Sequence, residues 1–289
     1  GGPQAAGLFV FGEEENPMPN YFAHLTFGAR VLAHLPEDLR TSLEGERAAF
    51  DLGCLGPDPL FFYHPATGNP ARREGLKMHK CSALPAVKRL RRAVEENVPM
   101  VRGYAAGFFC HLALDSACHP YVEARAARGG LAHLAMEAEF DRLLMERAGL
   151  DARRAHLPPP AGEAVCKAAA LAYGTAGPAE FRKGYLAMRR DTALLARVSG
   201  TRAGRAAGRL CGRLPVLAGA RGMILEAVPA PASAESSRVL GTLLERAVPV
   251  AAEQIGRFFA AVEEGAPLDP WLDRDFGGMA YRKTEPAPQ

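Results

Sequence analysis

Apolar residues recur along most of this chain at intervals of three and four positions, the spacing of one face of a helix. Runs that alternate apolar and polar residues between turn residues, as half-buried strands do, are scarce. The pattern therefore predicts an all-α, multi-helix fold. The predicted helices cover residues 21–35, 84–97, 100–119, 131–148, 162–173, 178–198, 203–214 and 233–264.

Two stretches rich in proline interrupt the helical pattern. Residues 51–80 combine proline, glycine and aromatic residues and are expected to form a long loop, a kind of segment that is usually functional in a compact domain. A Leu-Pro-Pro-Pro run at 157–160 separates a half that contains every histidine from a half rich in arginine. We expect an N-terminal extension at 1–18, a helical core at 19–157, and a helical C-terminal half at 158–289 packed on the same domain.

Composition adds limits on size and partners. The 289 residues, 48% of them hydrophobic, are enough to bury a sizeable core. The net charge of +3 says little about partners, but the stretch from Glu180 to Arg221 holds ten Lys or Arg against two Asp or Glu. The region from Arg182 to Arg221 is expected to be either a solvated surface or a peripheral contact with anionic membrane, with nucleic acid as a weaker alternative.

The chain shows no secretory leader and no run of eighteen apolar residues. We therefore expect a cytoplasmic protein, and secretion stays open because the chain does not begin with Met; Met18 is a plausible start. The six cysteines include no Cys-x-x-Cys pair, which argues against a sulfur-ligated zinc site. In a chain of this length they do not indicate a disulfide scaffold either.

The strongest chemical pattern is His111-x-x-x-Asp115-x-x-x-His119-Pro120. Steps of four residues place these side chains on one helix face, each offset by about 40° from the last. His111 and Asp115 can reach one metal ion, His119 suits a neighbouring ion, and Asp115 can bridge the two. Pro120 is expected to end the helix at His119, which would place the cluster at a helix C-terminus, where the dipole favours cations.

A second pair, His133-x-x-x-Glu137, has the same spacing and can share one ion. With His119 it supplies three ligands and leaves a position for water, as a catalytic zinc requires. One such pair alone is more often a surface pair than a ligand pair. Two pairs together with upstream candidates favour a metal cluster. The eight candidate ligands are His24, Asp58, His79, His111, Asp115, His119, His133 and Glu137.

The other three histidines fit this cluster less well. His34 lies about 280° around the first helix from His24 and is expected to face away. His64 lies in the aromatic loop and competes with His79 for a ligand role. His156 precedes the proline-rich break and is expected to be exposed.

These stretches together resemble the bacterial zinc-dependent phospholipase C family, which shares an all-helical fold with the P1-type nucleases. The resembling stretches are PNYFAH at 19–24, LGPDPLFFY at 55–63, MHK at 78–80, GFFCHLALDSACHPY at 107–121, and His133 with Glu137. The resemblance covers residues 19–141 in order, and its most specific part is the His-Asp-His-Pro stretch.

The resemblance implies a site for two or three zinc ions. The residues implied for the first ion are Asp58, His79, His111 and Asp115. Those implied for the second are His119, His133 and Glu137. A third ion would take His24, Asp115 and the amino group of the chain terminus. Here a chain that begins at Pro19, after removal of Met18, is expected to supply that amine and gain the third ion, whereas the longer chain fills two sites. The residue after the loop aspartate is Pro59, where the secreted phospholipases have an aromatic residue.

The expected function is a zinc-dependent phosphodiesterase that hydrolyses phospholipids by means of a metal-bound hydroxide. A nuclease or nucleotide phosphoesterase at the same site, and a non-catalytic metal-stabilised binding protein, are the alternatives; manganese or iron could replace zinc. Asp58 acts as general base or only as ligand. The aromatic residues at 61–63 form either an apolar lip for substrate or loop anchors, and Glu139 and Asp141 are expected to be solvated.

Overall fold

The computed structural model describes residues 21–65, 67–211, 222 and 224–281. Within these ranges the chain forms helices joined by turns, and the isolated bridge between Arg274 and Ala280 is the one β-type pairing. The all-α prediction is confirmed. The N-terminal extension, including Met18 and Pro19, lies outside the described residues.

The helices follow one another along the whole chain. They are α1 (Tyr21–His34), α2 (Glu37–Glu44), α3 (Arg47–Gly53), η1 (Asp58–Phe62), α4 (Pro70–Met78), α5 (Leu84–Glu95), α6 (Val101–Ala127), α7 (His133–Arg147), α8 (Glu163–Ala170), α9 (Pro178–Val198), α10 (Arg202–Cys211), α12 (Pro231–Glu264) and η3 (Pro270–Leu272). Helix α9 has the predicted bounds, whereas α2 and α3 were not predicted. Among the described helices, none is both long and apolar enough to cross a membrane.

Helix α6 is the centre of the fold, and its first half is buried all round. Such a helix must be covered by neighbours on every side. Glycines let α3 approach it closely: a Cβ added at Gly107 would lie 2.1 Å from the carbonyl oxygen of Phe50. This approach places the turn after α3 against His111. At Gly56 (φ +50°) there is no room for a side chain, because an added Cβ would lie 2.4 Å from Cδ2 of that imidazole.

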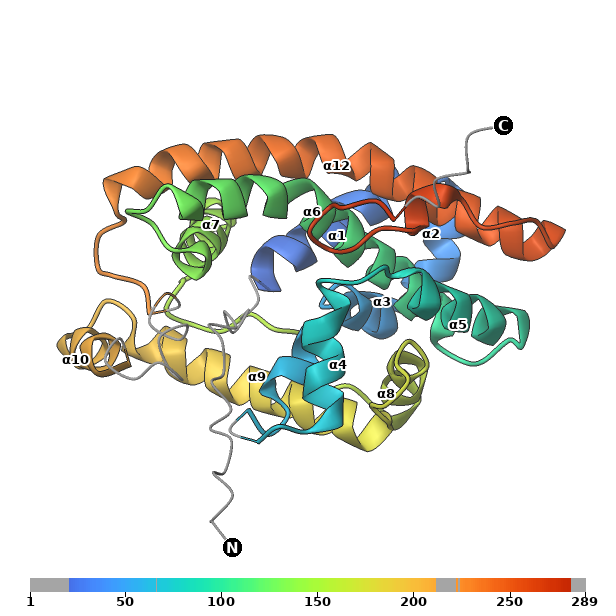
Figure 1. Cartoon of the computed structure of the whole chain (residues 1–289), viewed down its shortest axis with the longest axis horizontal. Coiled ribbons are helices and arrows are strands. Elements are labelled where there is room, and N and C mark those ends of the chain that lie inside the picture. Colours follow the sequence, from blue (N-terminus) through green and yellow to red (C-terminus); the bar gives the residue numbers. More distant parts are fainter. Residues whose placement is uncertain (1–20, 66, 212–221, 223, 282–289) are drawn as a thin grey trace, which may run out of the picture.

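The C-terminal helices enclose this centre. In Figure 1 the long helix α12 runs along one edge of the molecule and α9 along the opposite edge. Helix α12 packs against α1, α6 and α7, while α9 packs against η1 and α8. The division of the chain at residue 157 stays a prediction.

The expectation that residues 51–80 form one long loop is wrong. The end of α3, the short helix η1 and helix α4 all lie within this range. The start of helix α4 has two features that are typical of helix N-termini. The Asn69 side chain accepts a hydrogen bond from the amide of Arg72 at 2.8 Å, and Pro70 occupies the first helical position. The density of proline and glycine concealed two short helices.

The expectation that Pro120 ends the central helix at His119 is also wrong, because α6 continues to Ala127. Proline has no N–H, so the carbonyl of Ser116 loses its helical partner. Gly278 (φ +86°) packs against that carbonyl: a Cβ there would lie 2.6 Å from the oxygen. Val122, beyond the proline, is buried and holds the next turn against the core. The histidine cluster therefore lies inside a helix, and the argument from a C-terminal dipole does not apply.

Candidate metal centre

Asp115, on the middle of α6, lies between two sets of imidazoles. Its Oδ2 atom is 3.2 Å from Nε2 of His111 and 3.7 Å from Nε2 of His79. Its Oδ1 atom is 3.1 Å from Nε2 of His24 and 3.6 Å from Nε2 of His119. Each oxygen therefore faces a different side of the cluster.

All eight sequence-predicted ligands come together around this carboxylate. They fall into three groups in which one ligand atom per residue lies within 4.8 Å of the others: His24, Asp58 and His111; His79, His111 and Asp115; and His119, His133 and Glu137. The last group matches the set that the resemblance implies for a second ion. Asp58, a member of the first group, also lies 3.4 Å from His79 of the second group and 3.7 Å from His111, which both groups share.

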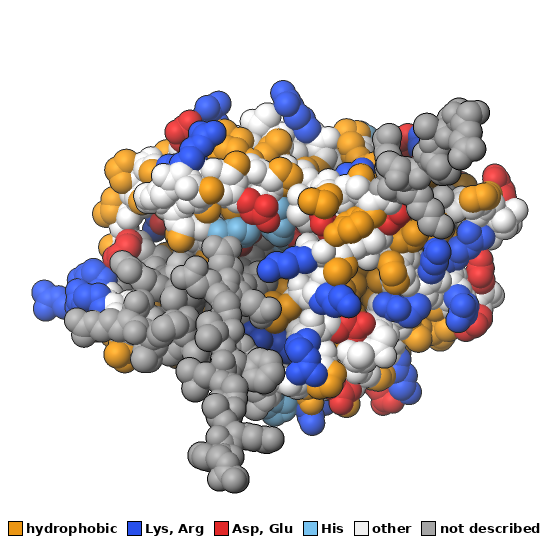
Figure 2. Space-filling view, in the orientation of Figure 1, with side chains coloured by type: hydrophobic (Ala, Val, Ile, Leu, Met, Phe, Trp, Pro, Cys, Tyr) orange, Lys and Arg blue, Asp and Glu red, His pale blue; other side chains and the backbone are white. Residues whose placement is uncertain are grey.

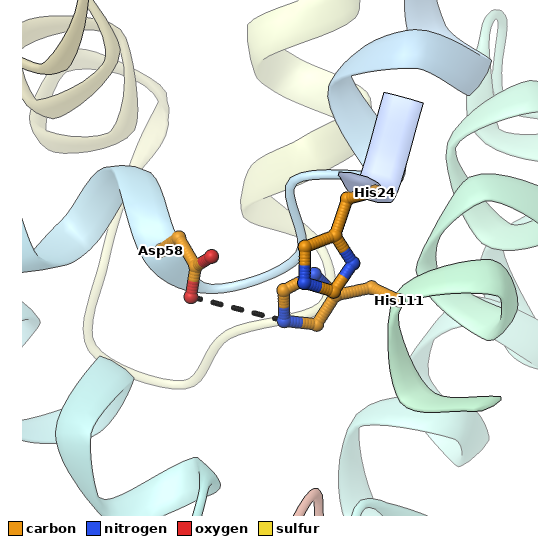
Figure 3. Close-up of side chains that lie close together, drawn as sticks. All are labelled: His24, Asp58 and His111. Atoms are coloured by element: carbon orange, nitrogen blue, oxygen red, sulfur yellow. Dashed lines mark ion pairs between the residues drawn. The ribbon is translucent and has the colours of Figure 1, made fainter. Parts of the chain in front are cut away.

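The group of His24, Asp58 and His111 forms the deep part of the site. Its members come from α1, η1 and α6, and Figure 3 shows the two imidazoles lying over one another with the carboxylate beside them. The ring centroids of His24 and His111 are 4.1 Å apart and the planes are 21° from parallel. All three side chains are at most 4% exposed.

Backbone carbonyls orient two of the imidazoles. Nδ1 of His111 lies 3.0 Å from the carbonyl oxygen of Cys54, and Nδ1 of His79 lies 3.1 Å from that of Gly75. A carbonyl only accepts, so Nδ1 of each ring is the donor, and Nε2 is the atom directed at the Asp115 carboxylate. A carbonyl behind the ring is the usual support of a metal-binding histidine.

Two buried nitrogens of this part have no hydrogen-bond partner among the described residues, namely Nε2 of His111 and Nδ1 of His24. Buried polar atoms are rarely left in that state. A cation between Nε2 of His111 and the Asp115 carboxylate would give this nitrogen a partner. The donor set of imidazoles and carboxylates without thiolate also fits zinc.

The group of His119, His133 and Glu137 forms the mouth of the site. The side chains of His119 and His133 are 14% and 15% exposed, more than any other ligand candidate. Glu137 Oε1 lies 3.0 Å from Nε2 of His133 and 3.6 Å from Nε2 of His119. A cavity of about 390 Å³ adjoins this end, and its lining residues are Glu123, Ala126, Ala127, Ala132 and His133. Histidine side chains reach the surface on the face drawn in Figure 2.

Charge within the cluster holds the carboxyl groups of Glu137 and Asp115 ionised. Burial by itself would raise the pKa of Glu137, but His133 and His119 outweigh burial and lower it to about 2. Burial opposes ionisation of Asp115 too, yet the imidazoles of His119, His111 and His24 hold its pKa well below the usual range. Burial would lower the pKa of His119, but Asp115 and Glu137 raise it to about 10. The metal-free site thus attracts positive charge.

The expectation that Glu139 and Asp141 are solvated is wrong, because both are buried. Glu139 pairs with Arg142. Both oxygens of Asp141 accept hydrogen bonds from the first turn of α1, from the amide of Phe22 at 2.9 Å and that of Ala23 at 2.8 Å. Burial raises the pKa of Asp141 to about 7, although these two amides oppose the rise. Asp141 therefore fixes the start of the helix that carries His24.

The remaining histidines stay outside the cluster. His34 is exposed at the end of α1, and His64 is exposed with φ +46°. His156, expected to be exposed, is half-buried, since its backbone amide donates to the Tyr21 hydroxyl at 3.0 Å.

The aromatic residues after Asp58 mainly anchor their own segment. Phe61 and Phe62 are buried in the core and Tyr63 is half-buried. The Phe61 ring also lies 5.0 Å from the His79 ring, between centroids. Of the two roles considered for residues 61–63, the structure favours anchors over an open apolar lip.

One site residue was missed by sequence reasoning. The ring of Phe276, far along the chain, is stacked on His79 with centroids 4.9 Å apart. A single phenylalanine between Asp275 and two glycines has no ligand chemistry and no helical spacing that would have identified it.

Comparison with known proteins agrees with this geometry. A family model described as zinc-dependent phospholipase C matches residues 23–174, just over half of the chain, and this span contains all eight clustered residues. No curated protein and no solved structure matches the chain.

Proposed function

Because the chain belongs to the zinc-dependent phospholipase C family, whose members hydrolyse phosphodiesters, we propose that the eight clustered side chains hold two or three zinc ions and that this centre cleaves phospholipids. The observation that carries the proposal is the position of Asp115, whose two carboxylate oxygens face separate sets of imidazoles. One carboxylate between two ligand sets suits a centre of closely spaced ions.

The deep and outer ligands would have different tasks. His79, His111 and Asp115 are arranged to hold one ion away from solvent. His119, His133 and Glu137 would hold another and, as three ligands, leave a coordination position toward the mouth. When bound there, zinc supplies Lewis acidity to phosphoryl oxygens and lowers the pKa of a bound water to about 7.

The protein side chains provide orientation and charge for this reaction. Glu137 contacts both His119 and His133 and so fixes the outer imidazoles relative to each other. Because those two histidines are the most exposed ligands, the phosphodiester would enter from their side. His24, with Nε2 on Asp115 and a buried unpartnered Nδ1, is placed to contribute to a third position.

We assign Asp58 the role of ligand rather than general base. The carboxylate is buried, and it faces His79 and His111 on the deep side of the site, away from the mouth. An Asp58→Asn variant tests the assignment. As a ligand variant it should lose zinc together with activity, whereas full zinc content with activity lost would assign Asp58 to proton transfer.

A peripheral contact with anionic membrane would suit a phospholipid substrate. Beyond the first turn of α9 the exposed residues form one face that combines basic and apolar side chains: Arg182, Lys183, Leu186, Arg190, Leu194 and Arg197. On α10 the exposed arginines are Arg202, Arg205 and Arg209. This composition fits the surface of an anionic bilayer. Arg213 and Arg221 lie outside the described residues.

The substrate proposal is tested with a panel on the zinc-loaded protein. The substrates are phosphatidylcholine, phosphatidylethanolamine and phosphatidylglycerol vesicles, a chromogenic phosphodiester, and single-stranded DNA and RNA. We expect release of diacylglycerol and a phosphorylated headgroup from at least one lipid. Cleavage of nucleic acid alone would make the chain a nuclease, and bound zinc without turnover would make it a metal-stabilised binding protein.

A further inference from the structure

Residues 269–281, termed here the C-terminal strap, cross the metal centre from outside the segment that the family model matches. The strap is tied to two helices. The amide of Ala83, at the start of α5, donates to the carbonyl of Arg274 at 2.8 Å. The Ser116 hydroxyl on α6 donates to the carbonyl of Asp275 at 3.2 Å. The second tie lies one residue from Asp115, so the strap is fixed beside the bridging carboxylate.

A closed turn points one side chain of the strap inward. The Asp275 side chain accepts a hydrogen bond from the amide of Met279 at 2.8 Å, and its carbonyl accepts from the amide of Gly278 at 3.2 Å. Gly278 has φ +86° and packs against the Ser116 carbonyl that Pro120 leaves without its helical partner. The turn thus packs against α6 where Pro120 interrupts the helical hydrogen bonding.

Phe276, inside this turn, is fully buried and touches two of the clustered histidines. Its ring is stacked on His79, with centroids 4.9 Å apart and planes 29° from parallel. It meets His111 edge to face, with centroids 5.3 Å apart and planes at 61°. The ring of Phe108 packs edge to face against Phe276, with centroids 5.8 Å apart.

His79 needs such support more than the other deep ligands. It follows the last residue of α4, so its backbone lies at the end of a helix rather than inside one. A tilted ring contact with Phe61 of η1 and one hydrogen bond to the carbonyl of Gly75 in α4 hold the imidazole. Phe276 stacks on this imidazole, whose Nε2 atom faces Asp58 and Asp115.

We propose that Phe276 is a positioning residue of the metal centre, which holds the imidazoles of His79 and His111 in their ligand orientations and makes the C-terminal strap a required part of the zinc site. The proposal rests on zinc binding by the clustered residues, which is part of the proposed function, and not on hydrolysis. Supports of metal ligands commonly contribute about 10–100-fold to metal affinity.

Two variants with the same chemical change test this role. Phe276→Leu removes the ring from the histidines but keeps an apolar side chain. Phe258→Leu is the matched control, since Phe258 is equally buried and its ring contacts in the described chain are with Phe109 and Phe259. The measurement is the rate at which each zinc-loaded protein releases zinc to a chelator. We expect release at least about tenfold faster from Phe276→Leu, and a rate near wild type from Phe258→Leu. Equal rates in the two variants would overturn the proposal.

A second measurement on metal-free protein separates positioning from general loss of stability. The stacked ring of Phe276 should shift the His79 ring protons upfield in the NMR spectrum. Phe276→Leu should abolish that shift, whereas Phe258→Leu should keep it, and Phe276→Tyr, which retains a ring, should restore it together with slow zinc release. An unchanged His79 signal in Phe276→Leu would contradict the contact. If the protein binds zinc but hydrolyses no substrate, the proposed function is wrong and the positioning role of Phe276 can still hold. If the wild-type protein binds no zinc, both proposals are wrong.

Discussion

The deep part and the mouth of the metal centre are built from the same residue types but are supported differently. In the deep part, His111 is braced by a backbone carbonyl and two stacked or edge-on rings, and is fully buried. At the mouth, His119 and His133 both contact Glu137 and are partly exposed. The deep part therefore holds its ligand side chains in fixed orientations, and the mouth is the end of the site that is open to solvent.

The two ends also join different parts of the chain. The ligand candidates of the deep end come from α1, η1, the end of α4 and α6, so ions bound there would connect four segments. An ion at the mouth would connect only α6 and α7. We therefore expect the deep end to govern stability and the mouth to govern access of substrate. Asp115 links them, and its loss should affect both.

Asp115→Ala should have the largest effect. Because each oxygen of this carboxylate faces a different ligand set, the variant should lose more than one zinc ion and at least about a hundredfold in activity. Zinc per chain, measured by emission spectrometry after gel filtration, tests the expectation. His34→Ala, an exposed change on α1, serves as control and should keep full zinc content. An Asp115→Ala protein with full zinc content would remove the bridge from the account.

Thermal unfolding should separate the two ends. A ligand present at a thousand times its Kd stabilises the native state by about 4 kcal/mol. At roughly 2–4 °C per kcal/mol for a chain of this size, chelation should lower Tm by roughly ten degrees. His111→Ala should remove most of this zinc-dependent increment, and His133→Ala should keep most of it. Scanning calorimetry with and without chelator measures both, and equal losses would erase the distinction between deep part and mouth.

The smallest expected effect concerns Asp141, which joins the mouth helix α7 to the start of α1. Its pKa is about 7 in the folded protein, above the ordinary 3.8, because the carboxyl is buried. Folding therefore favours the protonated form, so this contribution to stability is complete below about pH 3.8 and is lost as pH rises through 7. The loss amounts to at most about 4 kcal/mol.

Asp141→Asn removes this titration. Urea unfolding of metal-free wild type and variant at a series of pH values between 4 and 8 should show the wild type losing stability relative to the variant as pH rises. Parallel stability curves would mean that Asp141 does not titrate in this range and that the link between α7 and α1 is not charge-dependent.

Much of the site could be predicted because its ligands follow local rules. The steps of four in His111, Asp115 and His119, and in His133 and Glu137, place side chains on one face of any helix. Helix α9 was readable at both ends for a similar reason, with Gly177 before it, Pro178 at its first position and Ser199 and Gly200 after it.

The errors arose where distant contacts override local preference. Pro120 normally ends a helix, but the strap packs Gly278 against the carbonyl that the proline leaves free, and α6 continues. The role of Phe276 depends on the same tertiary contact. Nothing in the sequence near either position points to the other, so only the folded chain shows that they meet.

The most direct test of the central claim is a crystal of the zinc-loaded chain with anomalous diffraction recorded on both sides of the zinc absorption edge. Two edge-dependent peaks are predicted on either side of Asp115, one at His79 and His111 and one at His119, His133 and Glu137. A further peak at His24 would mark the third position. Peaks confined to one end of the site, or none within bonding distance of Asp115, would contradict a bridged zinc centre.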